Sequence, residues 1–88
     1  MSQTKLDEVW TLTIDHRHGT DVRVFRSEAA ARTALAAFAR QWWPGERGED
    51  ARYSDANFAA LDDAEAIDEY FREVGDECFA IDFVRVEG

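Results

Sequence analysis

The chain has 88 residues, of which 45% are hydrophobic and 12% aromatic, and it carries a formal net charge of −9. This apolar content excludes a disordered chain, and the length allows one domain, residues 1–88, whose single small core leaves little room for an enclosed active site. Cys78 is the only cysteine, which excludes an internal disulfide, and the first residues form neither a basic nor an apolar run. We therefore expect a cytoplasmic protein that is not an enzyme and that makes no contact with a membrane.

The negative charge lies in the C-terminal half of the chain. Residues 1–45 contain five acidic and six basic side chains, whereas residues 46–88 contain fourteen acidic and four basic side chains. The net charges of the two halves are therefore +1 and −10. A partner that is selected by charge should meet the C-terminal half.

A β-hairpin is predicted near the start of the chain. Residues 10–15 and residues 21–25 both alternate apolar with polar side chains and are rich in β-branched residues, as expected for half-buried strands. The polar residues 16–20 lie between them and include a glycine, which is typical of a hairpin turn. We therefore expect two antiparallel strands joined by a short loop.

The register of this hairpin is predicted by keeping the apolar side chains together. A two-residue loop at 18–19 would set Ile14 opposite Arg23. A three-residue loop at 17–19 sets Ile14 opposite Val22 instead, and it places the apolar side chains of both strands on one face. The second register is our prediction, with the glycine of the loop in a left-handed conformation.

A helix is predicted over residues 27–43. Ser27 is a good N-cap because its hydroxyl can accept a hydrogen bond from an unpaired amide of the first turn. Pro44 marks the end, since proline disfavours helical geometry at the residue before it. Apolar side chains recur at helical spacing, which predicts one face buried in a core. This stripe consists of Ala31, Leu35, Phe38 and Trp42.

Residues 44–61 are predicted to form an exposed loop, because they contain the only proline, two glycines and no apolar periodicity. An open alternative is a short helical turn within this segment. Such a turn would place Tyr53, Phe58 and Leu61 over the edge of the core.

A second helix is predicted from Asp62 to Gly75. Asp62 and Glu65 have the spacing of a capping box, and the glycine is typical of a helix end. The apolar stripe of this helix consists of Ile67, Tyr70, Phe71 and Val74. A last strand follows at residues 79–86, where the alternation changes phase and predicts a bulge near Phe83.

These elements predict an α+β fold of two layers, in the order strand, strand, helix, helix, strand. Both helices should cover one face of a three-stranded sheet, because neither helix can bury its apolar stripe alone. The last strand is expected beside the first, which makes the N-terminal strand central. Parallel and antiparallel pairing of the last strand both remain open.

Side chains that could carry chemistry lack partners at a recognisable spacing. His16 and His18 supply two metal ligands of a tight turn but neither a third nor a fourth. Cys78 follows two acids that disfavour its thiolate, so a structural thiol is expected. The glycines at 45 and 48 are followed by acids, which would repel a phosphate. We expect no catalytic residue, no metal and no cofactor.

The sharpest functional signal is a set of carboxylates in and around the second helix. Three of its glutamates form a row at i, i+4 and i+8 that is expected to face solvent, opposite the apolar stripe. A merely solubilising surface is the alternative. As a binding surface, it would repel DNA and RNA but complement a nucleic-acid-binding channel built from Lys and Arg. The predicted partner-binding residues are Glu49, Asp50, Asp62, Asp63, Glu65, Asp68, Glu69, Glu73, Asp76 and Glu77.

Three segments give the chain a family resemblance: His16-Arg17-His18-Gly19, Gln41-Trp42-Trp43, and Asp62 to Phe71. They resemble segments of small acidic proteins of bacteria and their phages. In size and charge the chain is similar to phage-encoded anti-CRISPR proteins and DNA-mimic inhibitors. This resemblance implies a stoichiometric inhibitor that occupies a nucleic-acid site on another protein, and it assigns a role to no single residue.

Two functions are therefore expected. The first is a non-enzymatic acidic module that binds a basic, nucleic-acid-binding protein through the second helix and the preceding loop, without direct contact to nucleic acid, so that salt weakens binding. The second is a self-associating structural or adaptor protein. Its homodimer would form through exposed aromatic side chains such as Trp43 and an unpaired sheet edge, and its association should survive salt.

Overall fold

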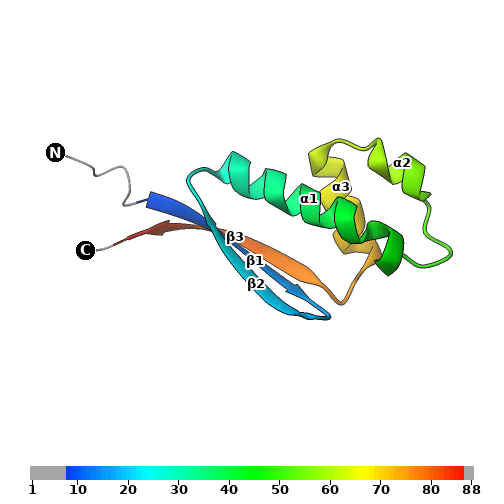
Figure 1. The fold of residues 1–88 in the computed structure, drawn as a ribbon, viewed down its shortest axis with the longest axis horizontal. Coiled ribbons are helices and arrows are strands. Elements are labelled where there is room, and N and C mark those ends of the chain that lie inside the picture. Colours follow the sequence, from blue (N-terminus) through cyan, green and yellow to red (C-terminus); the bar gives the residue numbers. More distant parts are fainter. Residues whose placement is uncertain (1–7, 87–88) are drawn as a thin grey trace.

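The computed structural model describes residues 8–86 and shows a three-stranded antiparallel sheet with helices on one side (Figure 1). In chain order the elements are β1 (Glu8–His16), β2 (Gly19–Phe25), α1 (Glu28–Glu46), α2 (Asp55–Ala59), α3 (Asp63–Glu73) and β3 (Cys78–Arg85). The strand order is β2-β1-β3, and both neighbouring pairs are antiparallel. The predicted α+β class and the central N-terminal strand are thus confirmed, and β3 proves to be antiparallel.

The molecule is elongated, with principal extents of 55, 25 and 15 Å. α1 lies across one face of the sheet, while α2 and α3 lie toward the end of the long axis at which the β1–β2 hairpin turns (Figure 1). The other face of the sheet, here called the open face, carries the exposed Val22 and Val24 of β2. Within residues 8–86, no helix combines the length and the apolar character that a membrane span requires.

Two connected groups of buried side chains hold these layers together. The first lies between the sheet and the helices and consists of Leu12, Ile14, Ala31, Leu35, Ala36 and Ile67. The second lies among the three helices and consists of Ala39, Trp43, Phe58, Ala66, Tyr70 and Val74. Phe38 and Phe71 are partly buried and touch both groups, so that the helical end is continuous with the sheet.

The predicted hairpin register is wrong. The strands pair directly at His16 and Gly19, so the loop contains two residues, and Ile14 lies opposite Asp21. This shift by one residue moves the valines of β2 to the open face and turns Asp21 and Arg23 toward α1. Polar pairing compensates, because His16 Nε2 lies 3.1 Å from a carboxylate oxygen of Asp21.

The positive φ that was predicted for Gly19 is confirmed, at +135°, although this residue begins β2 instead of ending a three-residue loop. The predicted bulge near Phe83 is absent. β3 pairs with β1 in one uninterrupted register from Cys78 to Arg85. The change of phase in the sequence has a simpler cause, because Phe83 and Val84 point to opposite faces. Phe83 shares the face that α1 covers but is exposed, since the helices do not reach this end of the sheet, whereas Val84 lies on the open face (Figure 1).

α1 begins as predicted, since the hydroxyl of Ser27 accepts a hydrogen bond from the amide of Ala30 at 3.0 Å. The predicted end at Pro44 is wrong, because the helix continues to Glu46 with Pro44 in its last turn. Trp43 explains the difference. Its ring is only 1% exposed and stacks on Phe58 with 4.0 Å between ring centroids, and this burial holds the residue before the proline in the helix.

Phe58, on which Trp43 stacks, belongs to α2. The segment predicted as an exposed loop therefore contains a short helix, as in the alternative of a helical turn. Ser54 caps α2 through the amide of Asn57, and Phe58 is buried. α3 carries the predicted capping box between Asp62 and Glu65. Its C-cap is Val74, and the following glycine does not adopt a positive φ.

Candidate functional site

The acidic residues gather at the helical end of the molecule. Residues 46–77, here called the acidic pole, contain twelve acidic and three basic side chains, a net charge of −9 that equals the charge of the whole chain. This segment includes α2 and α3, which lie at one end of the long axis (Figure 1). The remaining residues are neutral in sum. The ten predicted partner-binding residues all belong to the acidic pole, but the structure gives them different environments.

Glu69 does not face solvent, contrary to the prediction. Its side chain is 5% exposed and lies between Arg52, at 3.0 Å, and Arg72. Burial alone would raise the pKa of Glu69, but hydrogen bonds from Arg72 and Arg52, together with their positive charges, outweigh it and hold the pKa below its ordinary value. Glu69 is therefore a buried, ionised residue that fixes two arginines against α3, and a partner cannot reach it.

Glu77 is also buried, although the sequence placed it on the binding surface. The hydroxyl of Tyr70 donates to one carboxylate oxygen at 2.8 Å, and the amide of Arg17 donates to the other at 3.4 Å. Burial raises the pKa of the Tyr70 phenol, and the hydrogen bond to Glu77 raises it further. This carboxylate connects the hairpin tip to the segment after α3, so its role is structural.

Four of the predicted residues make contacts at the ends of helices while remaining at or near the surface. Asp62 and Glu65 cap α3, and Asp63 pairs with Arg40 at 2.8 Å. Glu73 accepts a hydrogen bond from the amide of Gly48 at 3.1 Å, which ties the loop after α1 to the end of α3. These residues add negative charge to the surface, but changing them would also disturb helix ends.

The remaining four predicted residues are exposed and make no ion pair or side-chain hydrogen bond within residues 8–86. They are Glu49, Asp50, Asp68 and Asp76. The arginines of the acidic pole do not neutralise them, because Arg47 pairs with Asp55 at 2.7 Å while Arg52 and Arg72 are held by Glu69. These four carboxylates therefore form the part of the predicted site that is free to meet a cationic partner.

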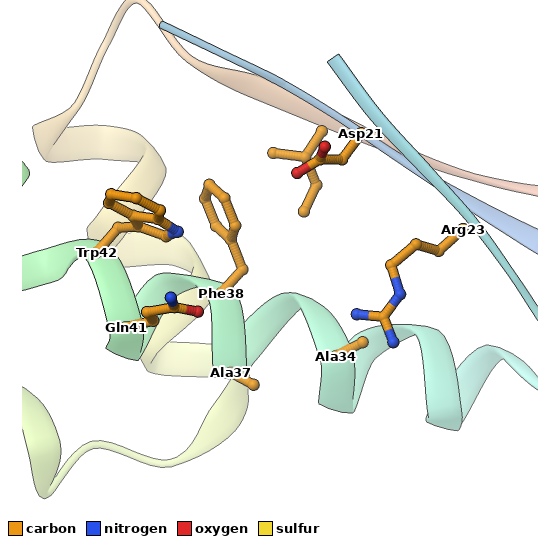
Figure 2. Close-up of a pocket in the computed structure, with 8 residues that line it drawn as sticks. Asp21, Arg23, Ala34, Ala37, Phe38, Gln41 and Trp42 are labelled. Atoms are coloured by element: carbon orange, nitrogen blue, oxygen red, sulfur yellow. The ribbon is translucent and has the colours of Figure 1, made fainter. Parts of the chain in front are cut away.

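A second candidate site is a groove between β2 and α1, which the sequence did not predict (Figure 2). Its volume is about 300 Å³. Two alanines of α1 leave the space, the side chain of Arg23 reaches across it from β2, and Phe38 and Trp42 form its other end (Figure 2). No carboxylate within residues 8–86 pairs with Arg23. The predicted register hid this groove by placing valines where Asp21 and Arg23 lie.

The two histidines of the hairpin have aromatic and polar neighbours. His16 contacts Asp21, and its ring centroid lies 5.5 Å from that of Phe38. The ring of His18 lies 5.7 Å from Trp42. In the part of the chain that the structure describes, no three His, Cys, Asp or Glu side chains come together as metal ligands.

Comparison with protein-family models, with curated proteins and with solved structures finds no match to this chain.

Proposed function

We propose that the protein is a non-enzymatic module that binds a basic protein through the acidic pole. The observation that carries this proposal is the arrangement of its ion pairs. The three arginines of the acidic pole are engaged with Asp55 and Glu69, while four exposed carboxylates have no cationic partner within residues 8–86. A partner with clustered Lys and Arg would supply the missing cations.

The class of partner follows from the sign and density of the charge. A segment with a net charge of −9 over 32 residues (46–77) repels the phosphates of DNA and RNA. Nucleic-acid-binding proteins present the complementary surface, because they bind phosphates through Lys and Arg. The protein would thus occupy such a site in place of nucleic acid, as an inhibitor of the kind that phages and mobile elements encode.

The buried carboxylates support a binding role over a catalytic one. Glu69 and Glu77 are buried residues of the acidic pole, and each already accepts hydrogen bonds from protein groups on both oxygens. The side chain of Glu46 is 9% exposed and forms an ion pair with Arg17 at 3.1 Å. A general acid or base must instead reach a reacting group on a substrate. Glu69 and Glu77 both serve the packing of the helical end.

The test compares two charge reversals of equal size. Asp68→Lys with Asp76→Lys should abolish capture of a basic partner from host extract, and Glu28→Lys with Asp82→Lys, which changes the charge by the same amount away from the acidic pole, should leave capture intact. Complexes with the isolated partner should weaken as salt rises, and single- or double-stranded nucleic acid should compete for the same site. Equal binding by both double variants, without any effect of salt, would show that the acidic pole only keeps the protein soluble.

A second candidate function, self-association, gains support from the exposed valines of the open face and from unpaired outer strands. It no longer involves Trp43, which is buried against Phe58.

A further inference from the structure

β2 is an outer strand of the sheet, and its backbone pattern leaves a regular row of hydrogen-bonding groups toward solvent. The two-residue loop makes His16 and Gly19 a hydrogen-bonded pair, because adjacent loop residues could not form the alternative pattern. Because hydrogen-bonded and non-hydrogen-bonded pairs alternate along an antiparallel ladder, the odd-numbered residues of β2, from Gly19 to Phe25, bond to β1. Thr20, Val22 and Val24 therefore direct their amides and carbonyls to the unpaired side, here called the free edge.

A second copy of the chain can pair along the free edge only in registers that match these groups. Pairing in which the two strands overlap over their whole length sets Val22 opposite Val22 of the second copy. The same register sets Asp21 opposite Arg23 of the second copy, and Arg23 opposite Asp21. These two charge pairs fall at non-hydrogen-bonded positions, where Cα atoms lie about 4.5 Å apart and side chains are close.

The neighbouring allowed registers are unfavourable. A shift by one step in one direction sets Asp21 against its own copy, and a shift in the other direction sets Arg23 against its own copy. Like charges directly opposite each other destabilise a strand pair. Within β2, opposite charges at alternate positions on either side of a valine therefore select one antiparallel, self-complementary register.

We propose that two copies of the protein associate along the free edge of β2 to form a continuous six-stranded sheet with twofold symmetry. Val22 lies on the symmetry axis, and the two Asp21–Arg23 pairs flank it. Arg23, which has no carboxylate partner within residues 8–86, gains one from the second copy. This inference gives the second candidate function, self-association, a defined interface, and it concerns a different surface from the acidic pole.

The fold accommodates this arrangement. A twofold axis perpendicular to the sheet keeps both sets of helices on one side. It also brings the groove between β2 and α1 (Figure 2) of one copy next to the groove of the other. Antiparallel pairing reverses one copy relative to the other. In each copy the acidic pole lies at the hairpin end of the sheet (Figure 1). The two poles therefore point to opposite ends of the dimer, and their mutual repulsion is small.

The competing explanation is that Asp21 and Arg23 protect the edge from pairing, since charged side chains on an outer strand often serve that purpose. The two explanations differ in what a charge swap does. Asp21→Arg alone and Arg23→Asp alone each place like charges opposite each other twice, and each should raise the dissociation constant of the dimer by about tenfold or more. The double swap, Asp21→Arg with Arg23→Asp, restores opposite charges and should restore dimerisation. Sedimentation equilibrium of the full chain measures the dissociation constants of the wild type and the three variants, and circular dichroism confirms that each variant is folded.

Cross-linking tests the register directly. In a Cys78→Ser background, Val22→Cys should form a disulfide-linked dimer, because hydrogen-bonded partners have Cα atoms about 5.5 Å apart and disulfides tolerate about 4.4 to 6.8 Å. Val24→Cys is the matched control, since Val22 and Val24 are 62% and 61% exposed. In the proposed register the two copies of residue 24 lie about 14 Å apart along the strands, beyond disulfide reach.

Three results would each overturn the proposal. The first is a wild-type chain that stays monomeric at about millimolar concentration, because a dimer with a weaker dissociation constant would not form in a cell. The second is single charge reversals that do not weaken the dimer, and the third is Val24→Cys cross-linking as fast as Val22→Cys. The first would assign the charges of β2 to edge protection or leave the edge to a strand of another protein. The second and third would place the dimer interface elsewhere.

Discussion

Glu69 shows how the surroundings of one carboxylate, more than its place on a helix, decide what it does. It stands four residues after Glu65 on α3, yet it is buried while Glu65 is exposed. Arg52, from the loop before α2, and Arg72, one turn further along α3, close over it. A buried carboxylate is stable only with such partners.

The pKa of Glu69 gives a prediction at acid pH. Because the pKa is lowered in the folded state, its contribution to stability is complete above the ordinary value of about 4.3 and is lost as pH falls through the folded value. Glu69→Gln should therefore cost about 1 to 3 kcal/mol at neutral pH, and this difference should shrink below about pH 4. Urea unfolding of both proteins between neutral and about pH 3 measures it. A difference that stays constant with pH would show that Glu69 is not held ionised by its arginines.

Tyr70 gives the corresponding prediction for the buried hydroxyl. Tyr70→Phe leaves the carboxylate of Glu77 with only the weaker bond from the amide of Arg17, and should lower the free energy of unfolding by about 1 to 3 kcal/mol. Because the pKa of Tyr70 is raised, the wild-type contribution is present below the ordinary value of about 10 and is lost as pH rises above it. The variant should therefore differ most from wild type at neutral pH and least in strong alkali, as measured by denaturant unfolding. An unchanged midpoint at neutral pH would contradict the structural role of this bond.

At the scale of elements, the end of α1 is set by a contact with α2. Pro44 signals a stop in the sequence, but Trp43 is buried on Phe58 and the helix runs on to Glu46. The amide of Arg47 then bonds to the carbonyl of Trp43 at 3.0 Å and closes the last turn.

Trp43→Ala tests this contact. Removing a fully buried ring should lower the free energy of unfolding by about 3 to 5 kcal/mol, a large part of the stability of a domain of this size. Trp43→Phe keeps a ring for stacking and removes the indole Nε1, which has no hydrogen-bond partner within residues 8–86, so it should cost less than half as much. Thermal unfolding followed by circular dichroism measures both. Equal losses would indicate that the position requires the full indole and not an aromatic stack.

The hairpin gives a prediction that isolates backbone conformation. A Cβ would meet no atom within 4 Å at either Gly19 or Gly75, but only Gly19 has a positive φ. Gly19→Ala should therefore destabilise by about 1 kcal/mol, while Gly75→Ala should be neutral or slightly stabilising. The comparison of their urea midpoints gives the answer. Equal midpoints would show that the hairpin can close without a glycine at this position.

At the scale of the whole molecule, the charge is distributed unevenly: the acidic pole carries a net charge of −9, and the charges of the remaining residues sum to zero. The acidic side chains of this segment share one end of the folded molecule, whereas the unfolded chain lets them move apart, so their repulsion opposes folding. Under the proposed function, this repulsion is the cost of a surface that binds a cationic partner.

Salt should relieve this repulsion. Raising sodium chloride from about 10 mM to about 500 mM shortens the screening length several-fold and should raise the melting temperature. Replacing Asp68 and Asp76 with Asn should raise the melting temperature at low salt and reduce the further gain from salt. Glu28→Gln with Asp82→Asn, outside the acidic pole, is the control and should leave the gain from salt unchanged. A wild-type melting temperature that falls with salt would mean that attractive ion pairs dominate the acidic pole.

The sequence by itself determined the α+β class, the strand order, the N-caps of α1 and α3 and the location of the charge, because these depend on local periodicity, capping chemistry and composition. Tertiary structure decided the rest. The hairpin register was set by the two-residue loop and the contact between His16 and Asp21, neither of which follows from keeping valines on one face. The burial of Glu69 and of Trp43 depended on Arg52 and Phe58, which belong to a segment without apolar periodicity. Contacts between residues distant in sequence, which no pattern along the chain records, thus fixed which acids face solvent and which side chains of β2 face α1.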